Sequence, residues 1–304
     1  MSSRTRVPET DEILLGDNLD LLPQFADGAF RLIYIDPPFN TGKRQNRKTL
    51  ETLPDENGDR TGFAGRRYKT RLLAESSYLD IFDDYMAFMA PRFEEARRLL
   101  AEDGTFYFHI DYREAHYCKL LLDEVFGRDS FLNEIIWAYD YGARTKRKWP
   151  AKHDTILVYV KDPERYYFDA EAVDREPYMA PGLVTAEKVA RGKLPTDVWW
   201  HTIVPTNGRE KTGYPTQKPE GILRRMLQAS TRPGDWCLDF FAGSGTLGAV
   251  AAKLRRHYVL IDDNPEAVAV MRKRLGVSDR DDAVDIAVPT AQSRSDTEIA
   301  TSLF

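Results

Sequence analysis

A turn rich in hydrogen-bond acceptors follows the strand-like run Arg31–Ile35. It reads Asp-Pro-Pro-Phe over residues 36–39. Each proline lacks a backbone N–H donor but keeps its carbonyl oxygen, and the two rings stiffen the turn. The corner therefore presents the Asp36 carboxylate and the Pro37 carbonyl as acceptors beside the ring of Phe39. It suits a flat group that carries an NH2, such as the exocyclic amine of a nucleobase. The alternative is a rigid strand end with Phe39 in the core.

A glycine-rich loop lies far along the chain, in the segment Leu238–Gly248. Gly243, Gly245 and Gly248 have the spacing G-x-G-x-x-G, directly after a strand-like run and at the start of a helical pattern. Such glycines allow a tight turn and close backbone approach to a ligand, and an acid that ends the next strand, here Asp262, can bind ribose hydroxyls. The pattern predicts a nucleoside-containing cofactor, with a tight turn alone as the alternative.

The loop stands near the wrong end of the chain for a fold of this type. The first βαβ unit normally opens the domain, yet here most strand-like runs precede it and only two further elements and a tail follow. A circularly permuted fold explains this order, and permutation is tolerated where the chain termini lie close together.

These two motifs, in this order, resemble the permuted β-group of S-adenosylmethionine-dependent DNA amino-methyltransferases. Matching segments also include Gly16–Leu19, before the Asp-Pro-Pro-Phe strand, and Pro215–Pro219 (Pro-Thr-Gln-Lys-Pro), before the glycine-loop strand. Phe108–Asp111 and Asn133–Trp137 are similar to family segments too. The resemblance runs from about residue 13 to about residue 275. It departs from the family at Asp262, where a longer Glu is common.

The resemblance implies methyl transfer from the sulfonium of S-adenosyl-L-methionine to an exocyclic amine, without a covalent enzyme intermediate. The implied catalytic residues are Asp36, Pro37, Pro38 and Phe39. The implied cofactor-binding residues are Asp17, Asn18, Gln217, Lys218, Asp239, Phe240, Gly243, Ser244, Gly245, Thr246 and Asp262. Lys218 is expected to face the carboxylate end of the cofactor. No residue spacing suggests a metal site, and sulfonium transfer needs no metal.

Two basic segments are candidates for contact with DNA phosphates. The first, from Lys43 to Arg71, carries a net charge of +5 and directly follows the acceptor turn, and the second, from Asp140 to His153, carries +4. The expected DNA-binding residues are Lys43, Arg44, Arg47, Lys48, Arg66, Arg67, Arg144, Lys146, Arg147 and Lys148. The alternative for each run is a solvated loop.

Other chemistry-bearing residues have weaker signals. His109 and Asp111 end a strand-like run and could line the target pocket, but a structural histidine with satisfied hydrogen bonds is favoured. Trp199 and Trp200 are favoured as packing residues over base-stacking ones. Neither Cys118 nor Cys237 follows a proline, which argues against cytosine carbon-5 chemistry, and both lie in apolar runs typical of buried thiols.

The elements that must position these residues alternate between strands and helices. Strand-like runs lie at Glu12–Leu15, Arg31–Ile35, Thr105–Ile110, Phe131–Trp137, Thr155–Val160, Trp236–Phe240 and Tyr258–Ile261. Helical patterns lie at Tyr85–Leu100, Glu114–Phe126, Gly221–Ser230, Leu247–Leu254 and Pro265–Leu275. This alternation predicts an α/β fold, a mostly parallel sheet with helices on both faces. The expected fold is a circularly permuted, Rossmann-like methyltransferase sheet with a small inserted target-recognition module.

The chain of 304 residues, 42% apolar, divides by composition into four parts. Residues 12–161 form the first part of the methyltransferase domain, with a long loop expected over 43–77. Residues 162–215 are the expected target-recognition insertion, residues 216–276 the cofactor-binding part, and residues 277–304 an acidic, disordered tail. The net charge of −5 disfavours indiscriminate nucleic-acid binding but permits the two local basic segments.

We therefore expect an enzyme that methylates adenine N6 in a base flipped out of double-stranded DNA. Methylation of cytosine N4 is the nearest alternative, because that exocyclic amine is a similar acceptor and is methylated by the same chemistry. RNA or protein-amide methylation is a further alternative. A non-catalytic DNA-binding module with the same fold is an alternative of another class. The chain has no apolar run long enough for a membrane span and no signal peptide, so we expect a cytoplasmic, nucleoid-associated prokaryotic protein. A homodimer and a cognate restriction endonuclease on a separate chain are left open.

Overall fold

An eight-stranded sheet in the order β1-β11-β10-β2-β6-β8-β7-β9 organises the protein. The computed structural model describes residues 5–40, 43–54, 60–61, 67–80, 84–142, 144–205 and 208–277, and for residues between 43 and 80 it describes the backbone only. The strands are β1 Glu12–Leu15, β2 Phe30–Ile35, β6 Leu100–Ile110, β7 Phe131–Ala138, β8 His153–Val160, β9 Val198–Trp200, β10 Trp236–Asp239 and β11 His257–Asp262. Neighbours from β1 to β6 pair in parallel, whereas β8 pairs antiparallel with both β6 and β7.

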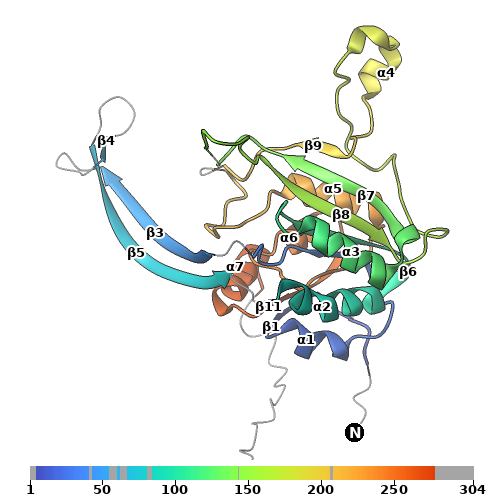
Figure 1. Cartoon of the computed structure of the whole chain (residues 1–304), viewed down its shortest axis with the longest axis horizontal. Coiled ribbons are helices and arrows are strands. Elements are labelled where there is room, and N and C mark those ends of the chain that lie inside the picture. Colours follow the sequence, from blue (N-terminus) through green and yellow to red (C-terminus); the bar gives the residue numbers. More distant parts are fainter. Residues whose placement is uncertain are drawn as a thin grey trace, which may run out of the picture.

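Helices cover both faces of this sheet (Figure 1). They are α1 Asn18–Leu21, α2 Tyr85–Leu99, α3 Ala115–Phe126, α4 Ala186–Arg191, α5 Glu220–Ser230, α6 Thr246–Lys253 and α7 Pro265–Leu275, with short 3₁₀ turns at Leu22–Gln24, Arg128–Ser130 and Pro181–Leu183. Alternate residues of β2 enter opposite core layers. Ile33 and Ile35 pack with α2 and α3, while Leu32 and Tyr34 pack with α5, α6 and α7. Because both faces are covered, the central strands are continuously apolar, which made them recognisable in the sequence.

The strand that carries the glycine loop lies inside the sheet despite its late place in the chain. β10 pairs in parallel with β2 on one side and with β11 on the other. This confirms the α/β sheet with permuted strand order. It also places the carboxyl ends of β1, β11, β10 and β2 next to one another, at one edge of the sheet.

The predicted long loop over residues 43–77 is wrong. The chain there forms a separate three-stranded antiparallel sheet in the order β3-β5-β4, with β3 Lys43–Pro54, β4 Arg60–Thr61 and β5 Arg67–Asp80. We call the β3–β5 hairpin the arm, and it curves away from the main sheet (Figure 1). The sequence of this hairpin lacks the apolar alternation that identifies a strand. Backbone pairing from Lys43 with Asp80 to Pro54 with Tyr68 supplies its regularity instead.

The expected insertion at residues 162–215 is partly sheet. β9, at the edge of the main sheet and parallel to β7, joins this segment to the methyltransferase sheet. Three residues at an edge are too short to show a period in sequence. The rest of the segment contains α4, which projects away from the sheet (Figure 1). Its base is tied to α5 by hydrogen bonds from the Asp169 amide to the Ala229 carbonyl and from the Asp174 amide to Gln228.

The expected disordered tail begins at Val277, and its residues 278–304 lie outside the described residues. Across the described ranges, no helix combines the length and the apolar character that a membrane crossing requires.

Candidate active site

A cavity of about 480 Å³ opens where the four neighbouring parallel strands end. Residues after β1, β2, β10 and β11 all line it, as do Lys218 and Tyr214 from the segment before α5. The carboxyl edge of an α/β sheet is where such folds bind ligands, because loops there leave a crevice above the strand ends. The two motifs of the sequence, the acceptor turn and the glycine loop, are therefore walls of a single cavity although about 200 residues separate them.

The glycine loop is fixed to the next strand by its own backbone. Gly243 has φ of 51° and donates its N–H to Asp262 Oδ2 at 2.8 Å. The other oxygen of Asp262 accepts the Asn264 N–H at 3.0 Å. Of the loop residues expected at the cofactor, Gly243, Ser244 and Thr246 line the cavity, as do Asp239 and Phe240 before them.

Gly245 has a different place from the other loop residues. It has φ of 70°, and a Cβ added there would lie 2.8 Å from Met271 Cγ. This glycine permits close packing of the loop against α7, and it is not among the residues that line the cavity.

Asp17 and Asn18 stand at the opposite wall, at the start of α1. Asp17 caps the helix by accepting the Leu19 N–H at 2.8 Å. The Asn18 side chain is buried and donates to the Phe240 carbonyl at 3.0 Å. Its Oδ1 has no hydrogen-bond partner among the described residues, and an unpaired buried acceptor at a cavity wall is a position for a ligand donor.

The acceptor turn is held rigidly on the side away from the glycine loop. The hydroxyl of Tyr85 donates to the Pro38 carbonyl at 2.7 Å. Phe39 is half-buried, packs against the core and also lines the cavity, so one face of its ring belongs to each. The Asp36 carboxylate forms an ion pair with Lys218 through Oδ2. Its Oδ1 is buried with no hydrogen-bond partner in the described part of the chain.

Lys218 lines the cavity and Gln217 does not, and the expected place of Lys218 at the cofactor carboxylate stays a prediction. The Lys218 ammonium lies against Asp36 and 5.0 Å from the centre of the Phe39 ring. Gln217 is buried and turned into its own segment. Its amide donates to the Glu210 carbonyl at 2.6 Å and accepts from the Thr212 N–H at 2.8 Å. Gln217 thus shapes the segment that presents Lys218, and it is Thr216 that lines the cavity beside Lys218.

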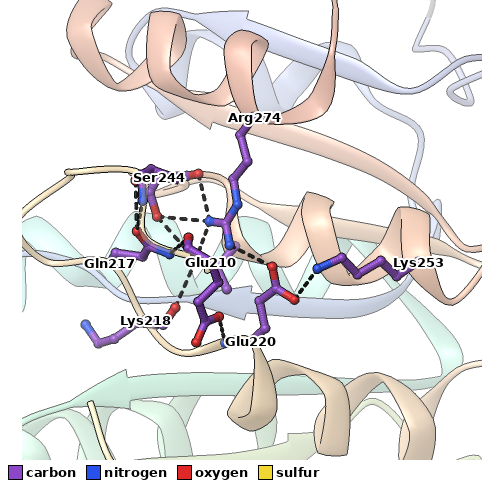
Figure 2. Close-up of polar contacts among 9 residues, drawn as sticks. Glu210, Gln217, Lys218, Glu220, Ser244, Lys253 and Arg274 are labelled. Atoms are coloured by element: carbon purple, nitrogen blue, oxygen red, sulfur yellow. Dashed lines mark hydrogen bonds and ion pairs between the residues drawn. The ribbon is translucent and has the colours of Figure 1, made fainter. Parts of the chain in front are cut away.

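A network not anticipated from sequence joins this segment to the glycine loop (Figure 2). Arg274 on α7 donates to the Ser244 carbonyl at 3.1 Å, to Thr246 Oγ1 at 3.0 Å and to Glu220 at 3.0 Å. Thr246 in turn donates to the Lys218 carbonyl at 3.1 Å. We call residues 210–220 with Arg274 the strap. Arg274 lies in the basic last turn of a helix, and sequence gives no sign that it bends back to the loop.

The cavity is electronegative. Five carboxylates line it, from Asp17, Asp36, Asp239, Asp262 and Asp263, against the two cations of Arg92 and Lys218. Burial raises the pKa of Asp239 well above its ordinary value, although the Phe241 N–H opposes this, and the charges of Asp36 and Asp262 add to the rise. Burial also raises the pKa of Asp262, against the hydrogen bonds from Asn264 and Gly243. A ligand with a cationic centre relieves the cost of crowding these carboxylates.

His109 is buried, and both of its ring nitrogens are engaged. Nδ1 lies 2.9 Å from the Tyr34 hydroxyl and Nε2 lies 3.2 Å from Asp154 Oδ2. This agrees with the favoured view of a satisfied histidine rather than a cavity-lining one. Asp111 accepts hydrogen bonds from Arg113, the Trp199 side chain is buried and the Trp200 side chain is 74% exposed. Asp154, the second residue of β8, belongs to no motif and could not be recognised from sequence.

The residues expected at DNA are distributed over two structures. Lys43, Arg44, Arg47 and Lys48 belong to β3, and Arg67 begins β5, so these five are on the arm. Arg66 lies outside the described residues. Arg144, Lys146, Arg147 and Lys148 are exposed on the connection between β7 and β8. The arm starts directly after the acceptor turn, which connects its base to the cavity.

Comparison with known proteins decides the family. A family profile described as DNA methylase, of the N6/N4 type, matches residues 30–273. The chain belongs to the N6/N4 DNA methylase family. Its relatives include the type II methyltransferase M.HpaI of Haemophilus parainfluenzae, 29% identical over 87% of this chain and 74% of that protein. They also include the DNA adenine methyltransferase YhdJ of Escherichia coli K12, 29% identical over 92% of this chain and 87% of that protein.

Solved structures of DNA methyltransferases share the fold. The M1.HpyAVI–SAM complex matches with a TM-score of 0.56 and 19% identity, covering 87% of this chain and 98% of that one. The cytosine-N4-specific PvuII DNA methyltransferase matches with a TM-score of 0.59 and 18% identity, covering 89% of each chain. This DNA methylase accordingly uses S-adenosylmethionine, and the predicted family, fold and cofactor are confirmed.

The cavity of this DNA methylase fits that cofactor by three of its own features. Its volume is within the range of small-molecule sites, roughly 300–1,000 Å³. Its excess of carboxylates suits a sulfonium cation, and Asn18 Oδ1 is an acceptor in need of a donor. Gly243 keeps the loop open, because a Cβ there would come within 3.3 Å of the Tyr214 ring. The residues that would hold the cofactor are Asp17, Asn18, Asp239, Gly243 and Asp262.

Proposed function

We propose that this DNA methylase transfers a methyl group to N6 of an adenine flipped out of double-stranded DNA, at a specific site. One observation carries the proposal: the Asp36–Phe39 turn and the glycine loop line the same cavity. A nucleoside-containing cofactor and an amine acceptor site thus adjoin. The name of YhdJ, an adenine methyltransferase, adds support for the choice of base.

Asp36 and Pro37 would orient the amine. S-adenosylmethionine supplies a methyl group on a positively charged sulfur. The target nitrogen is a poor nucleophile, because its lone pair is delocalised into the base. Accepting both N–H groups, at the Asp36 carboxylate and the Pro37 carbonyl, favours a pyramidal nitrogen whose lone pair faces the methyl carbon. The chain contributes positioning and electrostatic stabilisation, which are the main terms for such a transfer.

Phe39 and the basic segments would bring the base to this site. Flipping a nucleotide costs a few kcal/mol, and stacking on an aromatic ring returns about 1–3 kcal/mol. Phe39 has one ring face in the cavity for this purpose. Cationic side chains of the arm and of residues 144–148 would hold phosphates, which positions DNA without reading its sequence. Base readout belongs in this proposal to residues 162–215 and to the neighbouring 139–149.

Methylation of DNA from a host without adenine or cytosine methyltransferases tests the proposal. We expect tritium transfer from labelled S-adenosylmethionine, with N6-methyladenine as the product nucleoside by mass spectrometry. Asp36→Ala should abolish transfer, while Asp20→Ala, at an exposed aspartate of α1, should leave it unchanged. N4-methylcytosine as the product would instead assign cytosine. Transfer that survives Asp36→Ala would refute the catalytic role, and failure to bind S-adenosylmethionine in calorimetry would favour a non-catalytic DNA-binding protein.

A further inference from the structure

Next to Asp36 lies a buried polar chain that begins at the cavity wall, where Tyr34 lines the cavity. It consists of Tyr34 on β2, His109 on β6 and Asp154 on β8. The imidazole of His109 is fully buried and bonded at both nitrogens, to Tyr34 at 2.9 Å and to Asp154 at 3.2 Å. Asp154 also accepts a hydrogen bond from Tyr139 at 3.0 Å. Burying polar and ionisable groups costs free energy, so a buried chain of them next to the acceptor turn indicates a functional role.

The hydrogen bonds determine which nitrogen of His109 carries the proton. Burial would raise the pKa of Asp154, but the hydrogen bonds from His109 and Tyr139 and the charge of Lys218 outweigh it and leave the pKa below its ordinary value. Asp154 is therefore a carboxylate, and Nε2 must donate to it. The pKa of Tyr34 is raised well above its ordinary value by burial and by nearby carboxylates, so its hydroxyl keeps its proton and donates to Nδ1. Nδ1 is thus an acceptor.

This acceptor faces another acceptor. Asp36 Oδ1 lies 3.7 Å from His109 Nδ1, is buried, and has no hydrogen-bond partner among the described residues. Two acceptor atoms cannot bond until one of them gains a proton. The rings of Phe39 and Trp137, with centres 5.8 Å and 5.5 Å from that of His109, exclude water from the ring. A proton on the Asp36 carboxyl can bond to Nδ1 once the Tyr34 hydroxyl turns away, because this nitrogen has a single lone pair.

We propose that His109, oriented by Asp154, acts through Asp36 by accepting the proton that the target amine loses during methyl transfer. The inference rests on the proposed role of Asp36. The lone pair of the amine nitrogen forms the new N–C bond, and the C–S bond breaks with its electron pair going to sulfur. One N–H proton passes to the Asp36 carboxylate, and this neutralisation weakens its ion pair with Lys218. The carboxyl then turns the proton toward Nδ1 while the Tyr34 hydroxyl turns away from that nitrogen. The imidazolium then pairs with Asp154, as in other carboxylate–histidine relays, and returns its proton through Asp36 to water after the product leaves.

The relay predicts a pH dependence with a defined sign. His109 must be neutral to accept a proton, so the rate of methyl transfer rises with pH and then levels off. The titratable groups around the ring are Tyr34 from β2, Asp36 directly after β2, Asp154 from β8 and Tyr139 after β7. The charge of Lys218 from the strap acts on Asp154. Removing the negative charge of Asp154 destabilises the imidazolium. In Asp154→Asn, the pH above which the rate of methyl transfer stays constant should therefore be about 1–2 units lower than in the wild type.

Single-turnover methylation from pH 5.5 to 8.5, with cofactor affinity measured by calorimetry, tests the relay. His109→Gln keeps polar groups for Tyr34 and Asp154 but cannot be protonated. We expect a rate lower by about 100-fold at neutral pH, a cofactor Kd within threefold of the wild type, and loss of the levelling step. His116→Gln, at an exposed histidine of α3, is the matched control and should behave as the wild type.

Two outcomes would contradict the relay alone, and a third would contradict the proposed function as well. A wild-type rate and pH profile in His109→Gln would show that the ring only packs. If that variant does not fold, Asp154→Asn decides: levelling at the wild-type pH contradicts the relay. Transfer that survives Asp36→Ala would defeat the proposed function and the relay together, whereas an inactive Asp36→Ala with a normal His109→Gln would defeat the relay alone.

Discussion

The two oxygens of Asp36 have opposite surroundings. One is paired with the Lys218 ammonium and the other faces a neutral imidazole nitrogen. Without Lys218, the charge of Asp36 would add to the carboxylates of Asp239 and Asp262 in the same cavity. In the relay, the ion pair with Lys218 offsets this repulsion until Asp36 takes up the amine proton.

Lys218→Gln should therefore slow methyl transfer and leave cofactor binding nearly unchanged. A charge-assisted hydrogen bond is worth about 1.5–3 kcal/mol, so we expect a single-turnover rate lower by about 10- to 100-fold. The cofactor Kd, from calorimetry, should stay within threefold. Lys211→Gln, an exposed lysine of the same segment, should change neither quantity. A Kd raised more than tenfold with a normal rate at saturation would instead place Lys218 at the cofactor carboxylate, as the family resemblance implied.

At the scale of elements, the strap converts a loop into a fixed wall of the cavity. Glu220 at the first turn of α5 accepts from Arg274 on α7 and from Lys253 on α6, so three helices meet at one carboxylate (Figure 2). Arg274 is 8% exposed, whereas Lys253 is 63% exposed. The Arg274 contact should carry most of the stabilisation, because exposed ion pairs are screened by solvent.

Glu220→Gln should lower the free energy of unfolding by about 1–2 kcal/mol at pH 7, because it leaves the Arg274 guanidinium without its carboxylate. Burial would raise the pKa of Glu220, but the hydrogen bonds from Lys253 and Arg274 bring it below the ordinary value of 4.5. A depressed acid pKa stabilises the fold above the unfolded pKa and loses that contribution as pH falls through the folded one. In urea unfolding, the difference in free energy of unfolding between the wild type and Glu220→Gln should therefore be constant from pH 8 to about 5.5. It should become smaller below about pH 4.5.

Lys253→Gln is the comparison for this variant. It removes only the exposed partner and should cost less than about 0.5 kcal/mol. An equal loss in both variants, or a Glu220→Gln difference that grows toward low pH, would contradict the assignment of Arg274 as the main partner.

Elements that fill the core could be predicted from sequence, and contacts between them could not. The helix Pro265–Leu275 and the strand Glu12–Leu15 have the expected bounds because apolar periodicity records burial. The ion pair between Lys218 and Asp36 joins residues 182 positions apart, and no local pattern specifies it. Asp154 lies between His153 and Thr155 at the start of a strand, outside any recognisable motif. Motifs therefore located the cavity, while the partners that tune it emerged only from the fold.

At the scale of the whole molecule, the acidic and the basic side chains are concentrated in different places. Carboxylates line the cavity, and the two basic segments belong to the arm and to the β7–β8 connection. The acidic interior suits a cationic cofactor, and the basic surroundings suit a polyanion. A net charge of −5 is thus compatible with DNA as the substrate, because only the local field near the strand ends meets the phosphates.

The base of the arm should contribute to DNA affinity without contributing to sequence preference. Lys43 and Arg44 begin β3, and three residues separate them from the end of the acceptor turn. Changing both to Gln should weaken binding to methylatable and random duplexes by the same factor and reduce the slope of log K against log salt by up to about 1.8, since each phosphate contact contributes about 0.9. Fluorescence anisotropy between 50 and 300 mM salt, about the range in which such slopes are read, measures both.

The matched control removes two exposed arginines from the opposite edge of the sheet. Arg97 precedes β6 and Arg255 precedes β11, at the amino ends of those parallel strands. Arg97→Gln with Arg255→Gln produces the same change in net charge, so a purely long-range effect would weaken binding equally in both double variants. Local contact at the arm predicts an unchanged salt slope in the control. An equal slope in the arm variant and the wild type would show that phosphates are held elsewhere, with residues 144–148 as the remaining basic segment.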